Sequence, residues 1–371
     1  MKQSQKTILI LFLLLTNSCV TKFIPKTSED KEILVIEGLI TDKPGANIIK
    51  LSKSLPLGTK STAKPVNGCI VTISDDLGNI FNLNESVAGT YQTDSMQFRG
   101  MTGRFYTLHI STNTAFNNLN YESYPMEMKP VPPIDSIYYE KLTFKFGNDG
   151  VTPSQEGCQV YLNTHDPSNQ CKFFRWEYKE TWEFHLPYTV ANNICWISNS
   201  SDVINIKNTS SLQDSKVERY PMNLISNITD RLQVKYSILV NQYSLNENEY
   251  LYWEKLQNIS QQVGGLYDII PSVVASNVYC LTDPNEKVLG YFSVSANSSK
   301  RIFIHDRFAG VLSQYTDEAC IADTAFGGQV VPASAWVIIT SIIPPYMVYT
   351  YTKGCADCTV RGTKTEPAFW Q

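Results

Sequence analysis

The chain has 371 residues, of which 43% are hydrophobic and 18% are charged, and its formal net charge is −4. This composition excludes an intrinsically disordered chain, and the length is comfortable for two domains at roughly 100–200 residues each. Lysine and arginine form no basic block, so the sequence argues against a nucleic-acid partner.

The N-terminus has the pattern of a bacterial export signal. Lys2 and Lys6 are followed by eight consecutive apolar residues, Ile8–Leu15, and then by a short polar stretch that leads to Cys19. An apolar core of about 7–15 residues is typical of a signal peptide, whereas a membrane-spanning helix needs about 20. The other long apolar run, residues 335–351, is interrupted by two prolines and predicts a strand, a turn and a strand. We therefore expect no membrane-spanning segment in the mature chain.

Cys19 is the candidate lipid attachment site. The chain has nine cysteines, an odd number for an exported protein, and removing Cys19 leaves an even set of eight. Cys19 follows the apolar core and a small residue, Ser18, which is where bacterial lipoproteins carry their modified cysteine. The prediction is a signal peptide over residues 1–18 and a lipidated tether over residues 19–30. The alternative is a plain secretory signal with an incidental cysteine.

Residues 31–129 predict a small antiparallel β-sandwich. Short stretches rich in β-branched and aromatic residues recur about every 8–12 residues, separated by turns of Gly, Asn and Asp, which is the spacing of such sandwiches. The clearest stretches are ILVIEGLIT, CIVTIS, GTYQTD and GRFYTLHIS. The proline-rich segment KPVPP, residues 129–133, should be stiff and extended and marks the expected domain boundary.

Residues 134–371 predict a larger β-rich domain with one amphipathic helix. Its strand candidates include IDSIYYEKLTFKF, CKFFRWEYKETWEF, RLQVKYSILVNQYSL and KRIFIHD. The segment from Ser244 to Gly265 has a helical spacing of apolar residues, a capping pair at Ser244 and Glu247, and a glycine pair at its end. The fold class expected for the whole chain is therefore mainly β.

One predicted strand carries an aromatic stripe that consists of Trp176, Tyr178, Trp182 and Phe184. Such a stripe is typical of a sandwich core. It also occurs at interfaces and ligand platforms, because Tyr and Trp favour partly wet contacts. We favour the core and keep the platform as the alternative.

The sequence offers no recognisable catalytic, cofactor-binding or metal-binding constellation. Its four histidines, His109, His165, His185 and His305, lack partners at metal-ligand spacing, and there is no phosphate-binding glycine loop or nucleophile elbow. We therefore expect no enzyme, no cofactor and no metal. A hydrolase would need convergent acid, base or nucleophile groups and is the weakest function hypothesis.

The other eight cysteines are candidate disulfide residues: Cys69, Cys158, Cys171, Cys195, Cys280, Cys320, Cys355 and Cys358. The last two form a C-x-x-C motif, which occurs in redox dithiols, zinc sites and disulfide frameworks. Because its flanks have the composition of loops and the protein is predicted to be exported, we favour disulfides. The pairings considered are Cys158 with Cys171, and one cysteine of the motif with an earlier strand.

Several segments together make the chain resemble a known family. They are the signal that ends at Cys19, LVIEGLIT, PVNGCIVTISDDLGN, GTYQTD, PPIDSIYY, VKYSILVNQYSLNENEYLYWEKL, NEKVLGYFSVSA, KRIFI and the C-terminal CADCTVRGTKTEPAFW. In this order they resemble the Bacteroidota lipoproteins grouped as domain-of-unknown-function family 4249. The resemblance implies an immunoglobulin-like or transthyretin-like first domain, and a place beside TonB-dependent outer-membrane transporters of the starch-utilisation type. We expect the protein at the cell surface rather than at the periplasmic face of the outer membrane.

Two functions of different classes follow. The first is a lipid-anchored accessory lipoprotein that docks on an outer-membrane β-barrel complex, either a TonB-dependent transporter or the machinery that assembles outer-membrane proteins. The alternative is a surface lipoprotein that binds a glycan or a peptide through exposed aromatic side chains in a concave cluster of the second domain. The predicted anchor and the β-rich pattern favour the first.

Cys19→Ala is expected to leave the fold intact and to release the protein from the membrane, because the acylated side chain would be lost. Fractionation of cells into soluble and membrane pools measures this release. A variant that stays entirely with the membranes would contradict the anchor.

Overall fold

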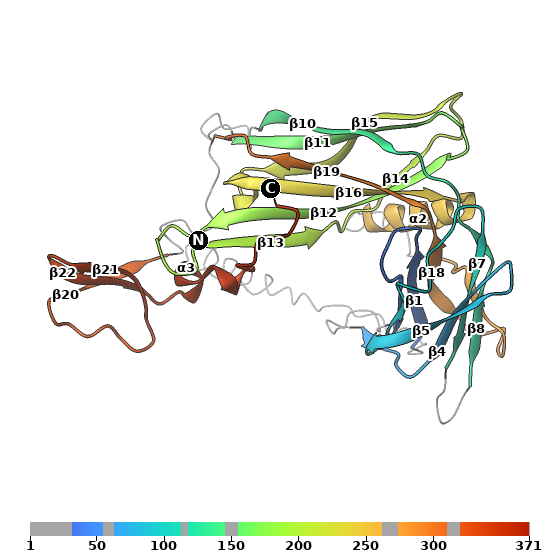
Figure 1. Ribbon diagram of the computed structural model, residues 1–371, viewed down its shortest axis with the longest axis horizontal. Coiled ribbons are helices and arrows are strands. Elements are labelled where there is room, and N and C mark those ends of the chain that lie inside the picture. Colours follow the sequence, from blue (N-terminus) through green and yellow to red (C-terminus); the bar gives the residue numbers. More distant parts are fainter. Residues whose placement is uncertain are drawn as a thin grey trace, which may run out of the picture.

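The computed structural model describes residues 32–54, 63–112, 118–144, 155–261, 274–309 and 320–370. Over these residues the chain is mainly β, which confirms the expected fold class. Figure 1 shows a first unit at one end of the molecule, a second unit in the middle and a projecting C-terminal arm at the other end. The predicted signal peptide and tether, including Cys19, lie outside the described residues.

The first unit is a sheet that curls round one apolar core. Its strands alternate buried and more exposed residues, as in β1, where Leu34, Ile36 and Ile40 point into the core. The strands from the N-terminal part of the chain are β1 (Leu34–Ile40), β2 (Ile48–Lys53), β3 (Lys64–Pro65), β4 (Ile70–Asp75), β5 (Ile80–Val87), β6 (Thr90–Thr93), β7 (Phe105–Ser111), β8 (Asn120–Ser123) and β9 (Met126–Glu127). All pairs among them are antiparallel.

Two strands from much later in the chain complete this sheet. β17 (Val278–Cys280) pairs antiparallel with β8, and β18 (Val288–Val294) pairs parallel with β1. The sequence assigns all of residues 134–371 to the second domain, whereas the structure places these two segments in the first unit. The reason is that a parallel pair needs a long crossover connection, so its partner strand is remote in the sequence and leaves no local signal.

The second unit is a sandwich of two sheets with one apolar core between them. The three-stranded sheet has the order β10 (Ile134–Phe144), β11 (Gln155–Asp166) and β15 (Ser215–Ser226). The five-stranded sheet has the order β13 (Ile194–Ser200), β12 (Phe173–His185), β16 (Lys235–Leu245) and β19 (Asn297–Ile304), and β14 (Asn205–Asn208) also pairs with β12. A short 3-10 helix, η1 (Asp230–Leu232), precedes β16.

The aromatic stripe of β12 lies in the core of the second unit. All four of its side chains are buried. The indole N–H of Trp176 donates to Gln242 Oε1 at 2.8 Å, and the indole N–H of Trp182 donates to Asp230 Oδ1 at 3.2 Å. The core interpretation is therefore confirmed.

The chain passes between the two units at a buried polar junction. It leaves the second unit after β16, passes through α2 (Glu247–Gln261), adds β17 and β18 to the first unit and returns as β19, which pairs with β16. At the return point, the N–H of Ser295 donates to the carbonyl of Ile40 at 3.0 Å. The hydroxyl of Ser295 donates to the carbonyl of Ser244 at 2.8 Å, and the hydroxyl of Ser244 donates to the carbonyl of Lys129 at 2.7 Å. These bonds tie the linker and both units together.

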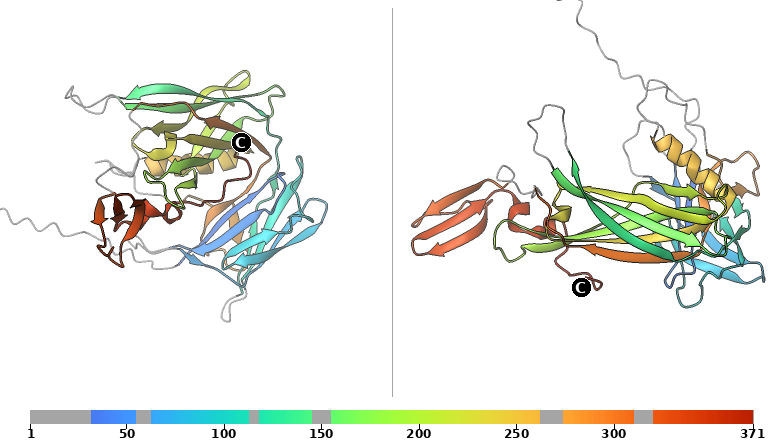
Figure 2. Two further views of the ribbon diagram at one scale, coloured as in Figure 1. Left: turned by 60° about the vertical axis from the view of Figure 1, so that its left-hand side comes forward. Right: turned by 90° about the horizontal axis from the view of Figure 1, so that it is seen from above.

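Helix α2 confirms the predicted helix over its described length but has a different cap, and the glycine pair expected at its end lies outside the described residues. Ser244 still belongs to β16, and Asn246 is the capping residue, because its side-chain oxygen accepts a hydrogen bond from the N–H of Glu249 at 2.8 Å. The helix lies near the place where the two units meet (Figure 2). There Tyr250 packs against Phe173, with 5.2 Å between the ring centroids. None of the helices that the structure describes is long and apolar enough to cross a membrane.

The C-terminal arm is a three-stranded antiparallel sheet with β22 (Pro345–Thr350) between β20 (Ala322–Phe326) and β21 (Trp336–Ile342). It projects from the end of the second unit that is remote from the first unit (Figures 1 and 2). Strands β21 and β22 confirm the strand, turn and strand expected over residues 335–351. The short helices α3 (Lys353–Ala356) and η2 (Cys358–Val360) then lead the chain back to the second unit.

Gly290→Ala is expected to destabilise the fold by about 3 kcal/mol or more. Gly290 has a φ of 85° within β18, and a Cβ atom there would overlap the carbonyl of Ile36 in β1. The matched control is Gly78→Ala, because Gly78 has a φ of 84° with no atom within 4 Å of the added carbon. This control should lose only about 1–2 kcal/mol. Urea unfolding measures both, and equal losses would contradict the close approach of β18 to β1.

Candidate functional site

The structure places four of the eight candidate cysteines in disulfides. Cys195 in β13 bonds to Cys358, and Cys320 at the start of the arm bonds to Cys355. The C-x-x-C motif therefore supplies one cysteine to each of two bonds, and one of them reaches back to an earlier strand as expected. Free thiols are present at the other candidate positions, Cys69, Cys158, Cys171 and Cys280.

The expected pairing of Cys158 with Cys171 is wrong. Cys158 lies near the start of β11, whereas Cys171 follows the turn at the far end of that strand. The length of β11 between them, at about 3.3 Å per residue, exceeds the separation of about 7 Å that a disulfide can bridge. Burial raises the pKa of each of these thiols to about 12, so both remain protonated and inert.

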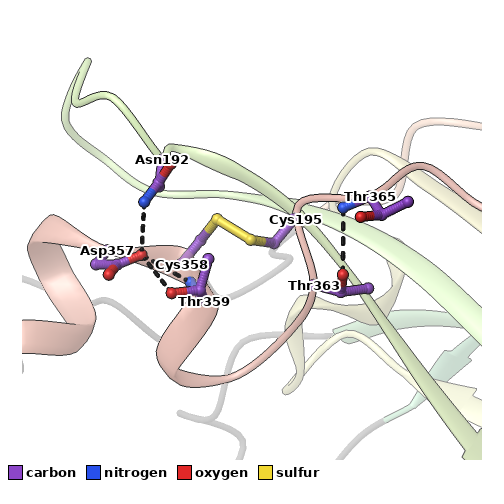
Figure 3. Close-up of a disulfide and its surroundings, with 7 residues drawn as sticks. All are labelled: Asn192, Cys195, Asp357, Cys358, Thr359, Thr363 and Thr365. Carbon is purple, nitrogen blue, oxygen red and sulfur yellow. Dashed lines mark hydrogen bonds between the residues drawn. A yellow bond between two sulfur atoms is a disulfide. The ribbon is translucent and has the colours of Figure 1, made fainter.

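The disulfide between Cys195 and Cys358 fastens the base of the arm to the five-stranded sheet (Figure 3). Beside it, Asp357 accepts hydrogen bonds from the Asn192 side chain at 3.1 Å and from the Thr359 hydroxyl at 2.7 Å. The hydrogen bond from Thr359 is the main reason that the pKa of Asp357 lies below its usual value. The carboxylate is thus held ionised as a cap for η2.

An ion pair continues this attachment into the core. Arg361 donates to Oδ2 of Asp230 at 2.8 Å, and its guanidinium lies 4.8 Å from the centre of the Phe184 ring. Asp230 is only 2% exposed and also accepts from the Trp182 indole, so the pair is well shielded from solvent. The segment after the arm is therefore held to the second unit by a disulfide and by a buried charge pair.

The arm itself is apolar and exposed. From residue 321 to residue 351 the only charged residue is Asp323. Nine large apolar side chains in this stretch are exposed: Ile321, Phe326, Val330, Trp336, Val337, Ile339, Ile342, Ile343 and Tyr351. Two of them, Ile342 and Ile343 at the turn, are 84% and 91% exposed. So many exposed apolar side chains are unusual on a monomeric protein, and they make the arm a candidate interaction site.

The arm also has open sheet edges. Strand β22 is the central strand, so β20 and β21 each pair on one side only within the described part of the chain. Natural proteins usually protect such edges with charged residues or by covering them. The outer strand β21, of sequence WVIITSI, contains no charged residue.

The second feature is a concave one that lies between the two units. It is a cleft of about 770 Å³ whose walls come from β1, β2 and β18 of the first unit, from β12 and residues 200–204 of the second unit, and from α2. Four aromatic residues line it, Trp176 from β12, Tyr252 and Trp253 from α2, and Tyr291 from β18. Tyr252 packs against Tyr291, with 4.6 Å between the ring centroids.

Arg175 is the buried cation of this cleft. Its guanidinium carbon lies 3.8 Å from the centre of the Trp253 ring, and its Nη2 forms an ion pair with Glu177. Glu177 also accepts a hydrogen bond from the Tyr243 hydroxyl at 3.3 Å. Arg175 is therefore stacked and charge-paired at once, which fixes the position of the Trp253 ring.

Glu249 is a fully buried carboxyl beside the cleft, at the first turn of α2. The indole N–H of Trp253 donates to its Oε1 at 3.4 Å. Burial raises the pKa of Glu249 to about 7, and hydrogen bonds from Ser293 and Trp253, with the charge of Arg175, offset only part of that effect. Glu249 thus titrates near neutral pH.

Comparisons with known proteins place the cleft and the arm differently relative to a protein family. The model of one protein family, described as Domain of unknown function (DUF4249), matches residues 20–301, which is more than half of the chain. The chain belongs to this family. Its expected membership is therefore confirmed, whereas no curated protein matches the chain. The DUF4249 match contains the cleft residues from Ile36 to Ser293, and the arm lies beyond its end at Arg301.

The histidines of this DUF4249 chain do not converge. His109 pairs with Glu122 at 3.2 Å, His165 with Asp135 at 2.7 Å and His185 with Glu183 at 2.7 Å, each on a different strand and partly exposed. Within the described residues, no group of three or more His, Cys, Asp or Glu side chains is arranged to hold a metal ion.

Sequence reasoning missed the two features for different reasons. The apolar run of the arm was recognised as strands, but a strand pattern does not reveal that the strands project into solvent. The cleft is lined by residues from six separate segments, so no local motif predicts it. One available signal was the order Asn246-x-x-Glu249, which has the form of a helix cap and places the acid in the first turn.

Glu249→Gln is expected to abolish a pH dependence of stability. The folded-state pKa of about 7 exceeds the usual glutamate value of 4.5, so the folded protein holds a proton that the unfolded chain releases. Stability is therefore expected to fall by about 3 kcal/mol as the pH rises from 4.5 to 7, at about 1.4 kcal/mol per pKa unit. The Gln variant cannot ionise and should match the wild type near pH 4.5 but exceed it at pH 8.

Urea unfolding at the two pH values measures this difference. Glu247→Gln, an exposed position on the same helix, is the matched control and should follow the wild type at both. A Glu249→Gln variant that also follows the wild type at pH 8 would contradict the buried ionisation.

Proposed function

We propose that this protein is a lipid-anchored accessory lipoprotein of the outer membrane, and that it docks on an outer-membrane β-barrel protein through its C-terminal arm. The observation that carries the proposal is the arm: nine exposed large apolar side chains, a single charged residue, and a base held by two disulfides. The role is to bind and position a partner, not to catalyse a reaction.

The composition of the arm matches the centre of a protein interface. Interface cores are depleted of charged residues and enriched in aromatic and aliphatic side chains, which supply most of the binding free energy. Trp336 and the turn residues Ile342 and Ile343 are the anchors of this kind on the arm. Because the disulfides and the Arg361–Asp230 pair hold the base, little conformational entropy would be lost on binding.

The open edges of the arm favour a protein partner over the bilayer itself. In hydrocarbon, unpaired backbone groups have no hydrogen-bond partners, so an open sheet edge is not tolerated there. A β-rich partner can pair with the edge of β21 by strand addition while its apolar surface covers the side chains. The wall of a closed barrel has no free edge, so at a barrel the pairing strand would come from a loop at the membrane surface.

The predicted anchor supports the same arrangement. Glu32, the first described residue, is 13 positions after Cys19, so the tether can span at most about 45 Å at about 3.5 Å per residue. A protein held this close to the outer membrane meets a membrane partner at a high effective concentration. Membrane anchoring and arm docking would then reinforce each other.

Affinity purification from native membranes tests the proposal. A tagged wild-type chain is expected to recover an outer-membrane barrel protein, identified by mass spectrometry. The double variant Ile342→Ser/Ile343→Ser should recover at least about tenfold less of it, since buried apolar anchors typically contribute more than 1 kcal/mol each.

The matched control is Leu77→Ser/Ile80→Ser, which removes two exposed apolar side chains, 73% and 67% exposed, from the first unit. It should recover the barrel as the wild type does, and thermal unfolding should show that both variants fold. Recovery of the wild-type chain alone, or undiminished recovery by the arm variant, would overturn the proposal.

A further inference from the structure

We infer that the cleft between the two units binds a short neutral oligosaccharide. This site is separate from the arm and does not depend on the docking proposed above. It has a volume of about 770 Å³, within the range of about 300–1,000 Å³ that is usual for small-ligand sites. Charge, aromatic content and backbone pairing each narrow the class of ligand.

The cleft is lined by charged side chains of both signs. Three carboxylates line it, Glu37, Glu177 and Asp202, together with two cations, Lys50 and Arg175. Arg175 is already paired with Glu177, so it is not free to bind a carboxylate or phosphate of a ligand. A strongly charged ligand of either sign would meet like charges, and a purely apolar ligand would strip water from all of them. A neutral ligand with many hydroxyl groups satisfies both signs of lining group.

The aromatic residues complement the apolar part of such a ligand. Tyr252, Trp253 and Tyr291 form a continuous aromatic group along one wall, and Tyr252 lies 5.4 Å from Trp253 and 4.6 Å from Tyr291 between ring centroids. The C–H faces of a sugar ring gain dispersion energy against aromatic carbon, while its hydroxyls reach polar side chains at the ring edge. The cleft offers both kinds of surface side by side.

Two strands that line the cleft are closed to strand addition by an extended peptide. Peptides commonly bind by adding a strand to a free sheet edge. In β1, Glu37 and Gly38 face β2 on one side and β18 on the other, and in β12, Arg175 and Trp176 face β16 and β14. At these two strands no edge is free, so recognition there depends on side chains, as suits a saccharide. Strand β18 is the terminal strand of its sheet and pairs with β1 alone among the described strands, and the trialanine probe tests its open edge.

Isothermal titration of the purified full chain with four neutral trisaccharides, cellotriose, maltotriose, xylotriose and the N-acetylglucosamine trimer, tests the inference. Trialanine and trigalacturonate serve as peptide and anionic probes. At least one neutral trisaccharide should bind with one site per chain, and more tightly than either comparison probe. Glu37→Gln/Asp202→Asn should weaken that binding at least about tenfold by replacing two carboxylate acceptors with amides.

The matched control is Glu218→Gln, an exposed carboxylate outside the cleft, which should bind as the wild type does. Tyr252→Ala is a second variant, which tests the aromatic wall. If this larger change unfolds the chain, the isosteric Glu37→Gln/Asp202→Asn variant decides the test. The inference is overturned if none of the four trisaccharides binds, if the cleft variants bind as tightly as the wild type, or if trialanine or trigalacturonate binds best. Loss of arm docking in the Ile342/Ile343 variant would leave the titration unchanged.

Discussion

The buried hydrogen bonds of Ser295 are the constraint on which the rest of the structure depends. Ser295 stands between β18 and β19, so one short stretch must leave the first unit beside β1 and enter the second beside β16. Its N–H binds the carbonyl of Ile40 and its hydroxyl binds the carbonyl of Ser244, one in each unit. Breaking these bonds in a dry site would cost about 1–3 kcal/mol for each group left unpaired. The two units are therefore joined by the fold itself and not by a simple linker.

The cleft is a direct consequence of this junction. Because the chain passes from β16 through α2 to β18 and back to β19, α2 lies where the two units meet. The first turn of α2 places Glu249 in the interior. Helix α2 supplies Tyr252, Trp253 and Glu249, and strands of two different sheets supply Tyr291 and Arg175. A polar group as costly as Glu249 is tolerated there because Trp253 and the helix N-terminus partly compensate its burial.

The arm is held in place by different interactions from those that form the cleft. It has almost no core of its own, so its position is maintained by covalent bonds and by the Arg361–Asp230 pair at its base. In the proposed role, that rigidity keeps an apolar surface presented at the end of the molecule (Figure 1). The DUF4249 match ends before the arm, so the two features lie in different parts of the chain relative to the family model.

The sequence by itself determined the mainly β fold, the strands of residues 335–351 and the helix after β16. It also determined the core position of the aromatic stripe and the DUF4249 resemblance. Each of these depends on residues a few positions apart, whose spacing reflects the strand or helix period. The parallel pairing of β18 with β1, the partners of Cys355 and Cys358, and the assembly of the cleft were decided only by the tertiary structure. These contacts join segments that are remote in the sequence, and apolar periodicity states that a strand is buried or exposed on one face but not which strand lies beside it. The same limit applies to the arm, since an apolar strand pattern is identical whether the strand enters a core or projects toward a partner.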